Sequence, residues 1–363
     1  MPTAKGNKYE LKSVNLDDIY LDTDNPRFRA YLLWSNTKIP KEAIPNSKDE
    51  ETIMSIYNDP RNKYFYEGID KHKPSIKETG VEEPIYVVQH PKKINKYIVK
   101  EGNLRCVILK SLQRSIRNGE QKQTNIDYSS VQAFIIPKAT TDAEIQLKIL
   151  QLQTGRHKWG ALAEALHYKR LVSEHQITIK EIERRFGTKK NKIDMKINSY
   201  NLWEAYVTWH KKKYNGKVPR ESQYSRFEEA HKQKSINENM LETKTGREKY
   251  FHLITGEGGT TTGRLGDPKA IRAFGKNVAD DPALIDDFYK NKSETIDSIV
   301  KKAQRKNPSK AFPNLLKDTD NLVKDLFPIT QEKTLIKNLS KNPEIIRSLK
   351  QLKKQTTKIL DNI

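Results

Sequence analysis

The chain has 363 residues, and its 67 Lys and Arg against 46 Asp and Glu leave a formal charge of +21 at pH 7. At roughly 150 residues per domain, this length predicts about two to three domains. No apolar run approaches the ~18 residues of a membrane-spanning helix, no secretory signal opens the sequence, and the single Cys106 excludes an internal disulfide. We therefore expect a cytoplasmic protein with no membrane partner. The positive charge indicates a polyanionic partner, for which nucleic acid is the usual candidate.

The excess charge is concentrated in the middle of the sequence. Residues 1–155 carry 24 basic and 20 acidic side chains, whereas residues 156–220 carry 16 basic and 6 acidic ones. The remaining 143 residues carry 27 basic and 20 acidic side chains. Nearly half of the excess therefore lies in less than a fifth of the chain, which favours a contact surface there. A solvated helical face is the alternative for an isolated run such as Lys211-Lys212-Lys213.

The first 137 residues alternate between strand and helix patterns. Residues 9–29 show a short apolar–polar alternation that closes on Asp24-Asn25-Pro26, so a strand is expected to run into a turn. An irregular, polar insertion is expected over 31–50. In chain order, the further expected elements are helices near 53–57 and 64–78, strands at 84–89 and 96–100, a buried helix over about 104–112 and a strand at 131–136. The pattern predicts a mixed α/β domain over residues 1–140.

Helical periodicity dominates from about 141 to 207. One helix is expected around Ile145 and Leu152, and a second from Trp159 to Leu171. Thr178-Ile179-Lys180-Glu181 has the form of a capping box, so a third helix is expected to begin there and to end at Gly187. A fourth helix follows from Thr188. Two short helices joined by a turn that contains glycine are typical of a helix-turn-helix, here over 178–201.

The C-terminal region, residues 208–363, is expected to be helical. Residues 211–224 and 255–267 are polar and turn-rich. The last ~75 residues are expected to be helical with proline breaks, and the terminal segment from Leu335 to Leu360 is amphipathic and rich in lysine. Such a segment could form a homodimer or dock on another protein, and Lys350, Lys353, Lys354 and Lys358 could contact DNA. A plain packing helix is an equal alternative.

A strand, a glycine turn and a helix meet at residues 96–112 and suggest a phosphate site. A glycine after a strand lets the backbone turn sharply and exposes the amide groups of a helix N-terminus, which favour an anion. Arg105 adds a bidentate donor. An ordinary strand-to-helix turn with a surface arginine is the alternative. The turn is not a P-loop, because no Gly-Lys-Ser/Thr follows.

The second helix of the expected helix-turn-helix carries the candidate DNA contacts. Its N-terminal part enters the major groove in such motifs, and it presents Lys189, Lys190, Asn191, Lys192 and Lys196. An asparagine could read adenine, and the lysines could bind bases or phosphates. Helix pairs around glycine also occur in all-helical cores, but the concentrated positive charge favours double-stranded DNA.

Together and in this order, these motifs resemble the ParB N-terminal domain family, which shares a fold with sulfiredoxin. The resemblance covers roughly residues 9–207. It rests on Asp24-Asn25-Pro26-Arg27, on Gly80 before Pro84-Ile85-Tyr86-Val87, on Gly102-Asn103-Leu104-Arg105, and on the helix-turn-helix. The implied fold class is α+β: a ParB/sulfiredoxin-like domain (1–140), an all-helical helix-turn-helix domain (141–207) and a helical C-terminal domain (208–363).

The resemblance implies a nucleoside triphosphate, CTP or ATP, bound with Mg²⁺ and gating DNA binding. It also implies a nucleoid-associated location. Gly102, Asn103 and Arg105 would bind the nucleotide with help from Arg156, and Glu101 would serve as metal ligand. The partition proteins have Gly-Glu-Arg-Arg where this chain has Gly-Asn-Leu-Arg, so only Gly102 and Arg105 carry over directly. Arg156 lies in Gln153-Thr154-Gly155-Arg156, a loose counterpart of the family's Asn-x-x-Arg.

Two other functions stay open at this point. One is an enzyme of a mobile-element or defence system, either a metal-dependent nuclease or a nucleotide hydrolase or kinase, with Glu101 and Arg105 as catalytic residues. The other is a DNA-binding adaptor whose nucleotide pocket is degenerate. No pair of histidines has metal-ligand spacing, and Cys106 follows the turn rather than lying inside it, so it is interpreted as a core residue.

Overall fold

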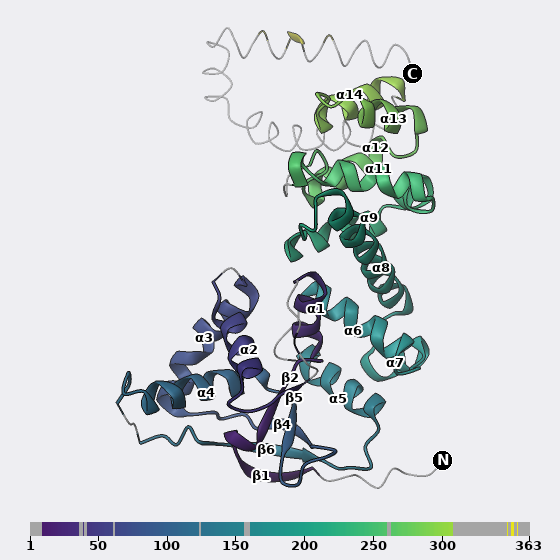
Figure 1. Ribbon diagram of the computed structural model, residues 1–363. Coiled ribbons are helices and arrows are strands. Elements are labelled where there is room, and N and C mark those ends of the chain that lie inside the picture. Colours follow the sequence, from purple (N-terminus) through teal and green to yellow (C-terminus); the bar gives the residue numbers. More distant parts are fainter. Residues whose placement is uncertain are drawn as a thin grey trace, which may run out of the picture. The chain divides into compact units, whose positions relative to one another are not determined.

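Six strands form one mixed sheet in the N-terminal part of the computed structural model, in the order β1-β6-β4-β5-β2-β3 (Figure 1). The strands are β1 (Glu10–Asn15), β2 (Ile19–Asp22), β3 (Glu42–Ala43), β4 (Ile85–Gln89), β5 (Tyr97–Glu101) and β6 (Ser130–Ile136). Strands β4 and β6 pair in parallel, as do β2 and β5. The pairs β1–β6, β4–β5 and β2–β3 are antiparallel.

The structure describes residues 9–35, 39, 42–60, 62–122, 125–155, 160–259 and 263–307, with 347, 350, 351 and 354. Contacts divide the chain into two units, Met1–Arg272 and Ala273–Ile363, and each is considered by itself. Within the described residues, no helix is long and apolar enough to cross a membrane.

Helices cover the sheet on both sides (Figure 1). They are α1 (Pro26–Trp34), α2 (Lys48–Asn58), α3 (Lys63–Thr79), α4 (Asn103–Arg117) and α5 (Asp142–Gly155). The expected helices and strands of this region are present. The expectation of an irregular segment over 31–50 is wrong at both ends, because Asn25 caps α1 with proline at its first position and Ser47 caps α2.

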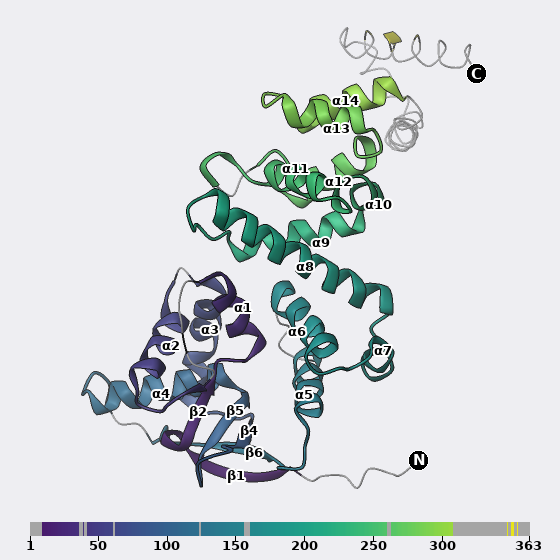
Figure 2. The same cartoon turned by 45° about the vertical axis from the view of Figure 1, so that its right-hand side comes forward.

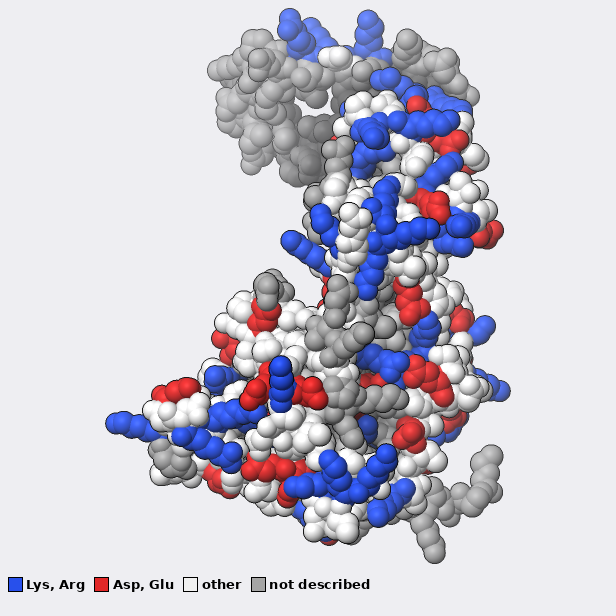
Figure 3. Space-filling view, in the orientation of Figure 1, with Lys and Arg blue, Asp and Glu red and all other residues white. Residues whose placement is uncertain are grey.

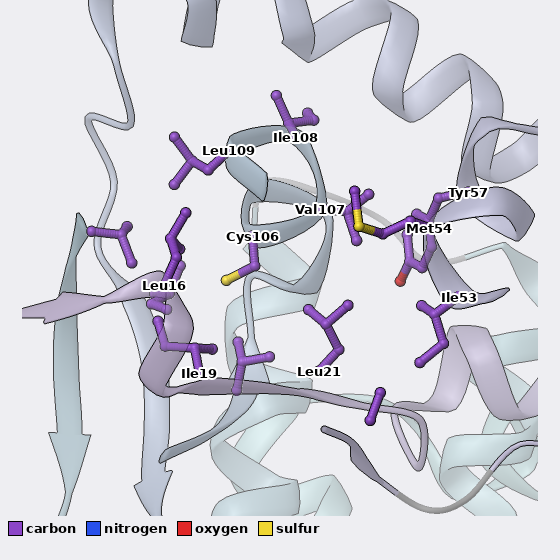
Figure 4. Packing of buried hydrophobic residues seen from close by; sticks show 14 of the residues in the cluster. Leu16, Ile19, Leu21, Ile53, Met54, Tyr57, Cys106, Val107, Ile108 and Leu109 are labelled. Atoms are coloured by element: carbon purple, nitrogen blue, oxygen red, sulfur yellow. The ribbon is translucent and has the colours of Figure 1, made fainter. Parts of the chain in front are cut away.

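The hydrophobic core of this part lies between the sheet and helices α2, α3 and α4 (Figure 4). Strand β2 contributes Ile19 and Leu21, and α4 contributes Cys106 and Val107, all of which are buried. Burial raises the pKa of the Cys106 thiol to about 12, so the thiol stays protonated at neutral pH. Cys106 is therefore a core residue, as the sequence predicted.

The rest of the first unit is helical (Figure 2). Its helices are α6 (Ala161–Ser173), α7 (Ile179–Phe186), α8 (Lys190–Lys213), α9 (Ser225–Lys232), α10 (Lys234–Ile236), α11 (Lys244–Ile254) and α12 (Pro268–Asn277), the last of which continues into the second unit. Trp203 and Tyr206 of α8 pack on Phe227 with ring centroids 5.4 and 5.1 Å away, and Tyr206 also contacts Phe251. The predicted class, an α/β domain followed by helices, is confirmed.

The expected domain boundary at 207/208 falls inside α8, which is continuous from Lys190 to Lys213. Aromatic side chains explain the difference. The stripe that begins with Ile193 continues past the expected end of the helix through Trp203 and Tyr206, so burial extends the helix. The expected boundary at 140/141 lies between β6 and α5.

The described part of the second unit contains α13 (Pro282–Lys290) and α14 (Ile296–Lys306). Phe274 and Phe288 pack with ring centroids 5.5 Å apart. The amphipathic segment 335–360 lies almost wholly outside the described residues, and of its four candidate lysines only Lys350 and Lys354 are described.

Candidate functional site

The turn between β5 and α4 forms around Gly102. This residue has φ 107° and ψ 17°, a left-handed conformation that favours glycine. A Cβ atom at this position would lie 2.5 Å from Cγ2 of Ile85, the first residue of β4. The turn therefore needs glycine at this position for two reasons, its backbone angles and the close approach of the neighbouring strand. It brings the N-terminus of α4 to the edge of a pocket.

The pocket has a volume of about 530 Å³ and lies between two helix N-termini and one side of α3. Asn25 and Arg27 line it from the start of α1, and Gly102 and Asn103 from the start of α4. Asn25 accepts a hydrogen bond from the backbone N–H of Arg27, but no side chain caps α4. The first amide groups of α4 are thus available to an anion in the pocket.

Arg105 lies in the pocket and is held by the protein around it. Its guanidinium donates to the carbonyl of Glu83 over 2.8 Å, and lies 3.4 Å from the carboxylate of Glu101 and 3.7 Å from that of Glu83. Its side chain is 20% exposed, so a ligand can reach it. A phosphate in this pocket would compete with two carboxylates for the same arginine.

Glu101 is joined to α1 through a glutamine that sequence reasoning did not place in the site. Gln153 of α5 donates to the Glu101 carboxylate over 2.7 Å and accepts from Arg27 over 3.0 Å. Arg27, Gln153, Glu101 and Arg105 thus form a continuous chain of polar contacts. Arg27 belongs to the Asp-Asn-Pro-Arg motif but is not among the residues expected to bind the nucleotide, and Gln153 appears in the sequence only as the start of a loosely matching segment.

Asn103 does not direct its side chain to a ligand, which corrects the expectation. Its side chain is buried, accepts from the N–H of Asp22 over 3.1 Å and donates to the carbonyl of Asp22. It therefore fastens α4 to β2, and only its backbone amide can serve the pocket. Asp22 is also buried, and burial raises its pKa even though Lys100 lies 2.9 Å away.

The remaining expected ligands of the pocket have different outcomes. Arg156 lies outside the described residues. Among the residues that the structure describes, no group of three or more His, Cys, Asp or Glu side chains is arranged to hold a metal ion. Glu101 is the expected metal ligand and is engaged with Arg105 and Gln153. A cation at this site would therefore need oxygen ligands from the nucleotide as well.

The charged side chains that line the pocket nearly cancel. The lining holds the cations Arg27, Lys71 and Arg105 against the carboxylates Glu67, Glu82, Glu83 and Glu101. Three positive and four negative groups leave a formal charge of −1, with His72 taken as neutral. The pocket offers backbone amides and arginines to phosphates, but it does not offer net positive charge.

The helix-turn-helix forms as expected (Figure 2). Thr178 caps α7 by accepting a hydrogen bond from the N–H of Glu181, and Gly187 ends the helix in a left-handed conformation with φ 65°. Ile182 of α7 and Ile193 of α8 are fully buried and hold the two helices together. The start of α8 exposes the predicted contacts, which are Lys189, Lys190, Asn191 and Lys192.

Lys196 does not belong to that exposed face, and the expectation that it contacts DNA does not agree with the structure. Its side chain is 7% exposed, and its ammonium lies 2.9 Å from Glu164 and 3.1 Å from Glu228. Burial alone would lower the pKa of Lys196, but the two carboxylates outweigh it and raise the pKa. Lys196 thus joins α6, α8 and α9 as a buried cation.

A second ion cluster joins the pocket to the helical part of the first unit. Arg170 of α6 is buried and donates to the carbonyl of Asp24 over 2.9 Å and to its carboxylate over 2.6 Å. Arg29 also contacts the Asp24 carboxylate. Burial would raise the pKa of Asp24, but the two arginines lower it. Asp24 comes directly before Asn25, so α6 is fastened to the pocket wall.

Comparisons with known proteins give matches at the level of structure alone. No protein-family model and no curated protein matches the chain. Two solved structures of the C-terminally truncated chromosome-partitioning protein ParB from Caulobacter crescentus match it. The complex with CTP-γ-S has 15% identity and a TM-score of 0.22, and covers 66% of this chain and 96% of that chain. The complex with the centromeric parS site has 12% identity and a TM-score of 0.31, and covers 81% and 99%.

Both matching chains are ParB proteins, the family that the sequence motifs resemble. At these TM-scores, residues of this chain are not matched one by one to residues of those chains. The assignments of site residues therefore rest on the geometry of this chain.

Replacing Gly102 tests the turn. Gly102→Ala should lower the free energy of unfolding by about 2–5 kcal/mol, because left-handed backbone costs about 1–2 kcal/mol and the clash with Ile85 about 1–3 kcal/mol more. Gly187→Ala is the matched control, since Gly187 has positive φ but nothing within 4 Å of an added Cβ. Equal losses in urea unfolding would contradict the close approach to Ile85.

Replacing Lys196 tests the buried cation. Lys196→Ala leaves Glu164 and Glu228 without their shared partner, so the free energy of unfolding should fall by about 3 kcal/mol at pH 7. Because the folded-state pKa of Lys196 is raised above 10.5, its contribution should be fully present below pH 10 and lost as the pH rises through the folded value. Lys192→Ala, on the exposed face, should change stability by less than about 0.5 kcal/mol in the same urea titration.

Proposed function

We propose that this chain is a ParB-like DNA-binding protein whose N-terminal pocket binds a nucleoside triphosphate with Mg²⁺. The observation that carries the proposal is that one unit contains both an exposed cationic helix-turn-helix and a pocket lined by two helix N-termini and two arginines. The first suits the phosphates and base edges of a duplex, and the second suits a phosphorylated ligand.

In the pocket, the amide groups at the start of α4 would hold phosphate oxygens, and Arg27 and Arg105 would bind them from either side. Lys71, which lines the pocket from α3, adds a third cation. A magnesium ion bound to the phosphates would supply positive charge that the lining lacks, and Glu101 is the carboxylate beside Arg105 that could contact it. The lining residues do not favour CTP over ATP.

The ion cluster around Asp24 gives the pocket a route to the helix-turn-helix. A phosphate that binds Arg27 would disturb the contact between Arg27 and Gln153. Asp24, three positions before Arg27 in the sequence, is bound by Arg170. Arg170 lies on α6, and Glu164 of the same helix binds Lys196 of α8. Helix α6 thus contacts Asp24 at one position and the second helix of the helix-turn-helix at another, and nucleotide binding would gate DNA binding through this helix.

Titration calorimetry with CTP, ATP, GTP and UTP tests the pocket. We expect binding that requires Mg²⁺, because the lining carries a formal charge of −1. Arg105→Ala and Arg27→Ala should each weaken the affinity at least about tenfold, the loss of one charged hydrogen bond of about 1.5–3 kcal/mol. Arg117→Ala is the control, since Arg117 is half-exposed, pairs with Asp17 and does not line the pocket.

The absence of heat with all four nucleotides would reject the pocket proposal and favour a DNA-binding adaptor. Equal affinity in the presence of a chelator would reject the role given to Mg²⁺.

Salt-dependent DNA binding tests the helix-turn-helix. The variant Lys189→Gln/Lys190→Gln/Lys192→Gln should reduce the slope of log affinity against log salt by up to about 2.7, at ~0.9 for each phosphate that is no longer neutralised. Its control, Lys48→Gln/Lys77→Gln/Lys138→Gln, removes three exposed lysines of the N-terminal part and should keep the slope. If both variants behave alike, this face does not bind DNA. Repeating the titration with Mg²⁺–nucleotide shows whether the nucleotide changes the affinity.

A homodimer, a protein partner for the C-terminal helices, and a nucleoid-associated location stay predictions. Nuclease or nucleotide-hydrolase activity stays open as well, with Glu101 and Arg105 as its candidate catalytic residues.

A further inference from the structure

The far end of α8 and the turn that follows it carry a second run of cations. The run of residues 205–220 contains no Asp or Glu. Four of its five cations are exposed, and the fifth, Lys211, is half-buried. The α8-end patch, as we name it, consists of Lys211, Lys212, Lys213, Lys217 and Arg220.

The patch is not neutralised by nearby carboxylates. Lys211, Lys212, Lys217 and Arg220 form no ion pair with any residue that the structure describes. Of the acids that flank the run, Glu204 pairs with Lys169. Glu221 is half-buried, and burial raises its pKa.

The backbone after α8 is fixed, so the cations are held in place. Asn215 and Gly216 both adopt left-handed conformations, with φ 49° and 77°, and reverse the chain. The N–H of Gly216 donates to the carbonyl of Lys211 over 2.8 Å, and a ring nitrogen of His210 lies 2.8 Å from the carbonyl of Lys217. A fixed surface loses less conformational entropy when it binds.

Aromatic rings position the last lysine of the helix. The ammonium of Lys213 lies 5.1 Å from the centroid of the Trp209 ring and 5.8 Å from that of Tyr214. His252 of α11 contacts the same ammonium and packs on Trp209. The Trp209 ring also stacks on Tyr206, so its surroundings are already filled by protein groups. This arrangement favours phosphates over stacked bases as the ligand.

Stabilising the helix does not require so many cations. A helix C-terminus carries about half a negative charge, which one or two lysines would compensate. Five cations therefore leave a large positive excess. Figure 3 shows Lys and Arg side chains on the helical part of the first unit, where α8 ends.

The patch is also distinct from the recognition face. Lys190 and Lys213 are the two ends of α8, and at about 1.5 Å per residue they lie about 35 Å apart.

We propose that the α8-end patch is a second DNA-binding surface, which binds backbone phosphates without reading sequence and lies about 35 Å from the first residues of α8. Phosphate contacts of this kind raise affinity and fix orientation but carry no sequence information. The surface does not depend on a nucleotide in the pocket, so it can be tested separately.

The test compares binding of the full chain to a 40-base-pair duplex of random sequence at several salt concentrations. The variant is Lys211→Gln/Lys212→Gln/Lys217→Gln/Arg220→Gln. Its matched control removes four exposed lysines elsewhere in the same unit, Lys48, Lys77, Lys92 and Lys138. The slope of log affinity against log salt should fall by up to about 3.6 in the patch variant, at ~0.9 for each phosphate that is no longer neutralised, and stay unchanged in the control.

A charge-retaining variant separates charge from folding. Lys211→Arg/Lys212→Arg/Lys217→Arg/Arg220→Lys should keep the salt slope of the original chain, and circular dichroism should show the same helix content for all variants. A patch variant that folds and keeps the original slope would overturn the proposal, as would a slope that falls equally in the control. Combining the patch variant with the Lys189/Lys190/Lys192 variant should add the two reductions in slope, since the surfaces lie far apart.

Discussion

Between β5 and α4 the chain turns within one residue, and the pocket depends on this turn. Gly102 can pass so close to Ile85 because it has no side chain. Glu101 precedes the turn and Arg105 follows it four positions later, and the turn brings their charged groups to within 3.4 Å of each other. It also places the side-chain amide of Asn103 where it accepts from the N–H and donates to the carbonyl of Asp22, the last residue of β2. A bulkier residue at 102 would displace the helix N-terminus, both charged groups and the link to β2 together.

Local patterns were sufficient to predict most elements, because their signals lie within a few residues. The β-branched run before Gln89 predicted β4, and Thr178 with Gly187 predicted both ends of α7. The glycine turn predicted where α4 begins. The start of α1 is not predicted from the sequence, because Asn25-Pro26 is assigned to a turn, whereas the structure has Asn25 as the N-cap and Pro26 as the first residue of the helix. A proline after an asparagine can open a helix as well as end a strand.

The side-chain contacts of the site could not be predicted in the same way. Gln153 is 52 positions from Glu101 and 126 from Arg27, so no periodicity connects them. The misplacement of Lys196 has a different cause. Lys196 falls at helical spacing after the buried Ile193, and this pattern indicates the core side of α8. The positive charge of the segment favours an exposed position for Lys196, whereas its helical periodicity indicates a buried one. The buried position is stable because Glu164 and Glu228 pair with the lysine.

Helix α8 has a mechanical consequence. Its middle section is embedded among the aromatic side chains of α9 and α11, while its first residues are exposed. A continuous helix of 24 residues moves as one rigid body, so a rotation of its embedded middle section displaces both of its ends. Over its length of about 35 Å, a tilt of only ~5° displaces one end by roughly 3 Å relative to the other. That displacement is about the length of a hydrogen bond. For the function proposed above, a small rotation in the helical core would therefore be enough to bring Lys189, Lys190, Asn191 and Lys192 into register with base edges or to withdraw them.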